Sequence, residues 1–290
     1  MIDTTPFQDI YPFQSHWLNL DGVRYHYLDE GPRNAPAVLL LHGNPTWSFY
    51  YRTLIPALAK SHRVIVPDHI GCGLSDKPAD YPYTLARHIA NVEALVAHLS
   101  LQNFSLVVHD WGGVIGLGYA TRHPDNVARL VVFNTAAFVL KKLPWQILIS
   151  RSKLLGALLV RGFNAFAGLA TKMAVTRPMP AQIKAGYLAP YNNWANRIAI
   201  YRFVQDIPWE ENHPSRPLLA QIDADLARLA EHPLLIIWGA QDFVFTARDF
   251  FTEWQRRFPH AETHVLPDAG HYVVEDAHPQ IIPWLERFLG

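Results

Sequence analysis

The sequence Val-His-Asp-Trp-Gly-Gly at residues 108–113 lies between an apolar run and a stretch rich in Ala, Gly and Leu. The apolar run, 106–108, predicts a buried strand, and residues 114–121 predict a helix, so the order is strand, sharp turn, helix. Small neighbours allow a strained turn that pushes the side chain of Asp110 outward. An ionised carboxylate needs no general base and can attack an electrophilic carbon directly. We therefore expect Asp110 to be a nucleophile. The alternative, an ordinary turn with a helix cap, has to be weighed against the other motifs.

The remaining apolar runs predict a mostly parallel sheet. A hairpin is expected from 16–20 and 23–28, joined by Asp21-Gly22, and helices from 49–59 and 85–99. Further strands are expected at 37–41, 64–66, 130–133, 234–238 and 264–266. Strands that alternate with helices imply an α/β fold. Between about 138 and 214 prolines interrupt helical pieces, so we expect a core of residues 1–137 and 215–290 with a helical cap, 138–214, inserted after the sixth strand.

Composition excludes several classes of protein. The chain has 290 residues, of which half are hydrophobic, and 25 basic residues balance 25 acidic ones, so no nucleic-acid partner is expected. The single cysteine, Cys72, excludes an internal disulfide and favours a cytoplasmic location. The N-terminal sequence lacks the pattern of a signal peptide, and no apolar run is long enough to span a membrane.

The balanced net charge hides a marked asymmetry. Residues 126–205 contain no Asp or Glu but eleven Lys and Arg residues. Such a basic, apolar segment predicts a cap that contacts an anionic substrate, an acidic partner or a membrane surface, and the alternative is a solvated outer face.

Two further residues follow predicted strands. Asp242 comes just after the strand at 234–238, and His271 follows the strand at 264–266. The chain order of nucleophile, acid and base is the one found in α/β-hydrolases. We expect His271 to take a proton from water and Asp242 to hold the imidazole in the required tautomer.

With these motifs, nearly the whole chain resembles the haloalkane-dehalogenase-like α/β-hydrolases. The resemblance rests on the His-Gly-Asn-Pro turn at 42–45, the Pro-Asp and glycines at 67–73, and the Asp110, Asp242 and His271 positions. It implies that Asn44 and Trp111 supply N–H donors that hold the departing anion, and their backbone N–H groups are expected to form an oxyanion site. Some relatives carry a Glu after the sixth strand, where this chain has Asn134, so the acid should be Asp242.

A narrower resemblance is to the β-lactone decarboxylases of bacterial long-chain olefin biosynthesis. It rests on segments outside the catalytic positions, at 69–78, 134–138, 144–147, 163–166, 189–194 and 202–208. It implies conversion of cis-3,4-dialkyl β-lactones to cis-alkenes and carbon dioxide, in an assembly with the enzyme that forms the lactone. Attack at the lactone carbonyl and attack at the ring carbon both remain open. The catalytic residues fit haloalkane hydrolysis equally well.

The apolar residues of the cap favour a long-chain substrate, although packing of the cap on the core would also require an apolar face. The cap leucines that carry this expectation are Leu154, Leu155, Leu158, Leu159 and Leu169. The expected pocket residues are Trp47, Phe138, Phe163, Phe166 and Tyr191.

Two other functions are weighed against these. An epoxide hydrolase would need two cap tyrosines to protonate the epoxide oxygen, and Tyr187, Tyr191 and Tyr201 are available, but Asn44 favours the dehalogenase type. A non-catalytic scaffold is disfavoured by the complete set of catalytic residues. No cofactor or metal is expected, because the histidines do not have ligand spacing.

Overall fold

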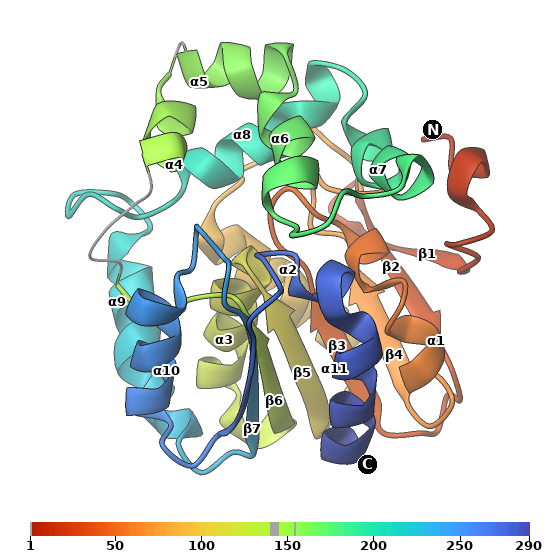
Figure 1. Ribbon diagram of the computed structural model, residues 1–290, viewed down its shortest axis with the longest axis vertical. Coiled ribbons are helices and arrows are strands. Elements are labelled where there is room, and N and C mark those ends of the chain that lie inside the picture. Colours follow the sequence, from red (N-terminus) through yellow and green to blue (C-terminus); the bar gives the residue numbers. More distant parts are fainter. Residues whose placement is uncertain (1, 140–144, 154) are drawn as a thin grey trace.

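The computed structural model describes residues 2–139, 145–153 and 155–290. A central sheet of eight strands runs through the core, in the order β1-β2-β4-β3-β5-β6-β7-β8 (Figure 1). Strand β2 pairs antiparallel with β1 and β4, and every other neighbouring pair is parallel. The strands are β1 (Ser15–Leu20), β2 (Val23–Glu30), β3 (Ala37–Leu41), β4 (Arg63–Pro67), β5 (Phe104–His109), β6 (Val127–Phe133), β7 (Leu234–Gly239) and β8 (Glu262–Leu266). The predicted α/β-hydrolase type of sheet is confirmed.

Helices cover both faces of this sheet because successive strand residues point in opposite directions. In β3, Val38 and Leu40 enter one apolar core, while Leu39 and Leu41 enter the other. The first core is closed by α1 (Ile55–Leu58) and α11 (Val273–Leu289). The second is closed by α2 (Leu85–His98), α3 (Trp111–Arg122), α9 (Arg216–Asp225) and α10 (Thr252–Arg257). The continuous apolar runs of the sequence are therefore strands buried on both faces.

The prediction of one helix over 49–59 is wrong. The segment forms a short 3-10 helix, η2 (Ser48–Tyr51), and a single turn, α1, separated by a turn at 52–54. Pro56 lies in the first turn of α1, where its missing N–H is harmless, whereas inside a longer helix it would remove a backbone hydrogen bond.

A layer of short helices lies over the carboxyl end of the parallel strands, between β6 and β7 in sequence (Figure 1). It consists of α4 (Trp145–Arg151), α5 (Leu155–Ala157), the π-helix η4 (Leu158–Gly162), α6 (Ala165–Met173), α7 (Ala181–Leu188) and α8 (Ile198–Gln205), which we call the cap. Lys141, Lys142, Pro144 and Leu154, which entered the sequence interpretation, lie outside the described residues. No helix in the described part of the chain is long and apolar enough to cross a bilayer.

Candidate active site

The turn at Asp110 joins β5 to α3 and has a strained backbone. Asp110 has φ 50° and ψ −125°, which costs a non-glycine residue roughly 1–3 kcal/mol. The next residues must be glycine, since a Cβ on Gly112 would lie 2.1 Å from the Leu41 carbonyl oxygen and one on Gly113 would lie 1.9 Å from Thr135 Oγ1. The Thr135 hydroxyl also donates to the Asp110 carbonyl. Packing therefore holds the turn against β3 and the segment after β6.

Each oxygen of the Asp110 carboxylate faces a different group. Oδ1 accepts the Asn44 backbone N–H at 2.7 Å, and Oδ2 lies 3.5 Å from His271 Nε2. Burial raises the pKa of Asp110, but interactions with His271 and His109 and the Asn44 N–H outweigh it and hold the pKa below its ordinary value. Asp110 is therefore ionised at neutral pH, as a nucleophile requires, and Oδ2 is the oxygen left without a backbone donor.

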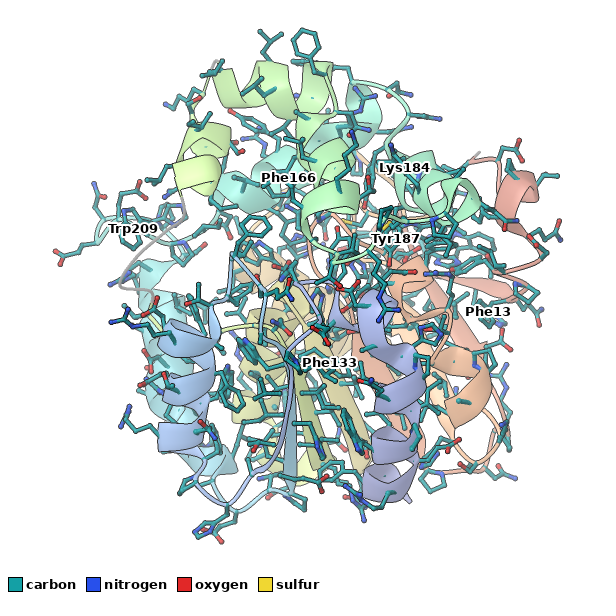
Figure 2. The ribbon with its side chains drawn as sticks, viewed as in Figure 1. Phe13, Phe133, Phe166, Lys184, Tyr187 and Trp209 are labelled. Carbon is teal, nitrogen blue, oxygen red and sulfur yellow. The ribbon has the colours of Figure 1, made fainter. Side chains whose placement is uncertain are left out.

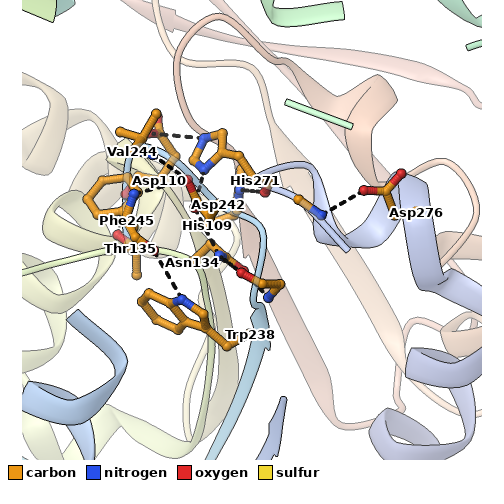
Figure 3. A network of polar contacts seen from close by, with 12 residues as sticks. His109, Asp110, Asn134, Thr135, Trp238, Asp242, Val244, Phe245, His271 and Asp276 are labelled. Atoms are coloured by element: carbon orange, nitrogen blue, oxygen red, sulfur yellow. Dashed lines mark hydrogen bonds and ion pairs between the residues drawn. The ribbon is translucent and has the colours of Figure 1, made fainter. Parts of the chain in front are cut away.

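His271 is held by Asp242 at the ends of two neighbouring strands. Its Nδ1 lies 2.8 Å from Asp242 Oδ2 (Figure 3). The other oxygen of Asp242 accepts the backbone N–H groups of Val244 and Phe245 at 2.7 and 3.0 Å. Because a carboxylate can only accept, Nδ1 carries a proton and Nε2 faces Asp110. The three residues expected from the strand ends are thus brought together in one hydrogen-bonded arrangement.

The negative charges of Asp242 and Asp110 set the protonation of His271. Burial lowers its pKa, but Asp242 and Asp110 outweigh the burial and raise the pKa to about 10. His271 is therefore cationic at neutral pH while Asp110 carries its charge. Esterification of Asp110 removes one of the two carboxylates and so lowers the pKa of His271 toward the range of a general base.

Two residues that sequence reasoning gave no role orient this pair. Asn134 donates from Nδ2 to Asp242 Oδ2 at 2.9 Å and to the Gly239 carbonyl at 3.1 Å, and its Oδ1 accepts the Gly239 N–H at 2.8 Å. His109 lies 2.9 Å from the His271 carbonyl oxygen through Nε2, and burial lowers the pKa of His109 to about 3. A neutral His109 must donate here because a carbonyl only accepts. The position of Asn134 at the end of a predicted strand, where some relatives carry an acid, could have indicated its role in the site.

The loop after β3 presses directly on the nucleophile. A Cβ on Gly43 would lie 2.1 Å from Asp110 Oδ1, so the close approach requires glycine. The Asn44 side chain donates to the Ile200 carbonyl in α8 at 3.2 Å, and its Oδ1 is buried with no partner in the described residues. Trp111 is the first residue of α3, so its N–H has no acceptor within the helix. Both expected anion-binding residues therefore lie at the nucleophile, but the Asn44 backbone N–H binds the second oxygen of Asp110 itself.

An apolar cavity of about 390 Å³ lies between the cap and the core and reaches Asp110, His271, Asn44 and Trp111. Phe138 and Phe166 line it as expected, and Phe166 is labelled on the cap above the sheet in Figure 2. The cavity is also lined by Leu159, Leu169, Met173, Leu219, Phe243, Val244, Phe245 and Phe250. The sequence interpretation did not include Phe243 and Phe245 among the pocket residues. Their position in the same loop as Asp242 could have indicated that they lie near the site.

Three expected pocket residues lie elsewhere, and their assignment to the pocket is wrong. Trp47 is fully buried among aromatic rings, with its indole N–H donating to the Gly186 carbonyl at 3.1 Å. Tyr191 is buried and donates to the Thr46 carbonyl at 3.2 Å. Phe163 follows η4 at the outer surface and is 71% exposed. The aromatic character of a residue does not by itself show whether its side chain packs in the core, lines the cavity or lies at the surface.

The tyrosines weighed for epoxide protonation are also occupied away from the cavity. Tyr187 donates to Glu275 Oε2 at 2.8 Å, and Tyr201 donates to the Lys153 carbonyl at 3.0 Å. None of the three cap tyrosines lines the described cavity. Among the described residues no group of three or more His, Cys, Asp or Glu side chains is placed to hold a metal ion.

Sheet order, strained nucleophile turn and the arrangement of Asp110, Asp242 and His271 are those of an α/β-hydrolase. Residues 36–277 match the family described as the alpha/beta hydrolase fold, and the chain belongs to that family. A solved loop variant of a haloalkane dehalogenase from Bradyrhizobium elkanii superimposes with a TM-score of 0.84 at 25% identity, over 95% of this chain and 97% of that one.

Sequence relatives narrow the family further. The chain is 48% identical over 296 residues to the cis-3-alkyl-4-alkyloxetan-2-one decarboxylase of Shewanella oneidensis, covering all of this chain and 91% of that protein. It is 35% identical over 292 residues to haloalkane dehalogenase 2 of Mycobacterium bovis, covering 99% of both. The chain therefore belongs to the β-lactone decarboxylase family within the dehalogenase-like α/β-hydrolases, and both predicted resemblances are confirmed.

Proposed function

We propose that this protein converts long-chain cis-3,4-dialkyl β-lactones to cis-alkenes and carbon dioxide, with Asp110 as nucleophile. The observation that carries the proposal is the 48% identity to a cis-3-alkyl-4-alkyloxetan-2-one decarboxylase along the whole chain. An apolar cavity that ends at a buried, ionised carboxylate suits a small polar ring carrying alkyl chains.

We propose that Asp110 Oδ2 attacks the ring carbon that bears the ring oxygen. The bond from this carbon to the ring oxygen breaks, giving an alkyl ester of Asp110 and a free carboxylate. Loss of carbon dioxide then forms the alkene bond and expels the Asp110 carboxylate, so no water, proton or oxidant is consumed. Displacement inverts the ring carbon and an anti elimination follows, and the two steps together preserve the cis arrangement.

The surrounding residues each have a task in this sequence. The Asn44 backbone N–H, 2.7 Å from Oδ1, binds the oxygen that becomes the ester carbonyl. The cationic His271 lies 3.5 Å from Oδ2 and stabilises the negative charge that moves to the released carboxylate. Trp111 and the side chain of Asn44, which line the cavity, complete the anion site.

Haloalkane hydrolysis is the second candidate, since a relative at 35% identity is named a haloalkane dehalogenase. In that reaction Asp110 displaces halide, and His271 must then lose its proton and activate water. The two reactions use the same nucleophile but differ in their need for a general base.

The test offers the purified protein a cis-dialkyl β-lactone and a set of haloalkanes in parallel, with alkene followed by gas chromatography and halide by ion detection. Alkene formation without halide release supports the proposal, and halide release with untouched lactone overturns it. The control is Asp110→Asn, which keeps the shape of the side chain but removes its charge and should abolish either turnover.

We further propose that the reaction takes place in the cytoplasm as part of long-chain olefin biosynthesis. In this proposal the protein associates with the enzyme that forms the lactone. The support is the resemblance of the whole chain to the β-lactone decarboxylases. Co-purification of the two proteins from cells that express both would test the association.

A further inference from the structure

The cap carries most of the exposed large hydrophobic side chains in the described part of the chain. Of ten large hydrophobic side chains that are exposed there, eight lie within residues 148–194, and the other two are Trp17 and Val265. We define the cap patch as Leu155, Leu158, Phe163, Leu169, Met173 and Trp194. Helix α5 lies at the end of the cap farthest from the strands (Figure 1), and α5, η4 and α6 contact one another in series. Exposed apolar groups gathered in this way mark an interaction surface.

The patch is continuous with the wall of the active-site cavity. Leu169 and Met173 are one turn apart on α6, so they share a face of the helix. Both line the cavity and both are exposed, as is Ile149 on α4. Residues that are at once lining and exposed mark the mouth, which therefore opens between α4 and α6 inside an apolar rim.

The charged residues of the cap segment are all basic. Residues 145–205 contain no Asp or Glu. Lys153 and Lys172 are exposed beside patch residues, and the Arg161 guanidinium lies 4.4 Å from the centre of the Trp194 ring. Among the basic residues of the described cap, only Arg151 has an ion pair, with Glu210. An apolar surface with uncompensated cations is complementary to an anionic lipid headgroup layer over hydrocarbon.

We propose that the cap patch docks the protein on an anionic membrane surface with the cavity mouth facing the bilayer, so that the apolar substrate enters from the lipid. The nature of the substrate rests on the proposed function, whereas docking itself does not. A long dialkyl substrate is poorly soluble, and a cavity of about 390 Å³ is near the small end of the ~300–1,000 Å³ range of ligand pockets. Long alkyl chains therefore reach the apolar rim, where lipid shields them from water.

Co-sedimentation of the full-length protein with sucrose-loaded vesicles tests the docking. We expect binding to vesicles of phosphatidylglycerol and phosphatidylethanolamine and little binding to vesicles of phosphatidylcholine. Binding to the anionic vesicles should weaken at ~0.5 M salt, because salt screens the attraction between surface charges. Lys153→Gln with Lys172→Gln should weaken binding about 25-fold, at roughly 5-fold for each cation. Leu158→Ser with Phe163→Ser should weaken it roughly 100-fold through lost apolar burial.

Matched substitutions outside the cap provide the controls. Trp17→Ser removes an exposed apolar side chain, and Lys60→Gln with Arg248→Gln removes two exposed cations, and neither should change vesicle binding. Circular dichroism verifies that all variants are folded. The proposal is overturned if the wild type stays in solution at low salt, or if the cap variants bind as well as the wild type, which would leave the patch to a protein partner.

Turnover separates this proposal from the proposed function. Leu158 and Phe163 do not line the cavity, so their double variant should convert a soluble short-chain β-lactone at the wild-type rate. Absence of turnover in the wild type would overturn the proposed function and leave the vesicle result unaffected. Equal loss of soluble turnover and vesicle binding in the Leu158 and Phe163 variant would overturn the docking role, because the patch would then be needed for the fold of the site.

Discussion

Replacing Asp242 with Asn should convert His271 from a cation into a neutral imidazole at pH 7. The asparagine oxygen can still accept the N–H groups of Val244 and Phe245, which lie 2.7 and 3.0 Å from Asp242 Oδ1, so the loop should keep its shape. The negative charge beside Nδ1 is lost. Burial, which lowers the pKa of His271, is then opposed only by Asp110.

The magnitude follows from the two opposing effects. The pKa of His271 is raised from 6.5 to about 10 in the native protein, and we expect it to fall to 6.5 or below in the variant. The fall from about 10 to 6.5 corresponds to about 5 kcal/mol of differential interaction between the two protonation states. The folded state binds this proton more tightly than the unfolded state. The resulting stabilisation is therefore fully present below pH 6.5 and is lost as pH rises toward 10.

The assay is a pH titration of the ring carbon signals in protein labelled with ¹³C-histidine, with His271→Gln used to assign the resonance. In the wild type the His271 signal should move near pH 10, and in Asp242→Asn it should move below pH 7. Asp268→Asn is the matched control, because Asp268 is an exposed carboxylate three residues away in sequence. A His271 resonance that still titrates near pH 10 in Asp242→Asn would refute the reasoning.

Three further substitutions probe the supports of the site. Asn134→Ala removes hydrogen bonds that order the segment after β7, and kcat should fall about 10-fold with a loss of ~1–3 kcal/mol in unfolding free energy, measured by urea titration. Gly43→Ala puts a methyl group 2.1 Å from Asp110 Oδ1 and should lower kcat/KM at least ~100-fold, measured by steady-state kinetics. Arg52→Ala leaves the largely buried Glu275 carboxylate without its cation, now 2.7 Å away, and should lower the free energy of unfolding by ~3–5 kcal/mol, measured by urea titration.

Each of these has a control in the same chain. Gly168→Ala adds a methyl group where nothing lies within 4 Å and should leave kinetics unchanged. Arg24→Ala breaks an exposed pair with Asp76, where solvent screens the attraction, and should lower the free energy of unfolding far less than Arg52→Ala. A Gly43 variant with wild-type kinetics, or an Arg52 variant no less stable than Arg24→Ala, would contradict the assigned packing. Unchanged kcat in Asn134→Ala would show that the backbone donors alone orient the acid.

The strands and the three candidate catalytic residues were predictable because both depend on local sequence. Runs such as 37–41 and 234–238 are apolar throughout, which a strand needs when both of its faces are buried. Asp110 and Asp242 follow buried strands, and His271 follows the more exposed strand β8. Parallel strands bring their carboxyl ends to one edge of the sheet. The helix expected over 49–59 failed because Pro56 outweighed its apolar spacing.

The pocket could not be predicted with the same reliability. Trp47, Phe163 and Phe166 are equally apolar in sequence, yet one is buried in aromatic packing, one is exposed and one lines the cavity. The positions of these side chains depend on which face each short cap helix turns toward the core. Helices of three to nine residues are too short for a periodic apolar pattern to indicate that face.

The sequence by itself determined the strand order along the chain, the nucleophile turn, the identity of the three catalytic candidates and the basic character of the cap. Only the tertiary structure decided that Asn44 binds the second oxygen of Asp110, that Asn134 orients Asp242, and that the cavity opens through an apolar rim. The physical reason is the range of the interactions. Strand burial and turn strain act between neighbours in sequence, whereas hydrogen bonds across 66 or 108 residues and the shape of a cavity exist only when distant segments meet.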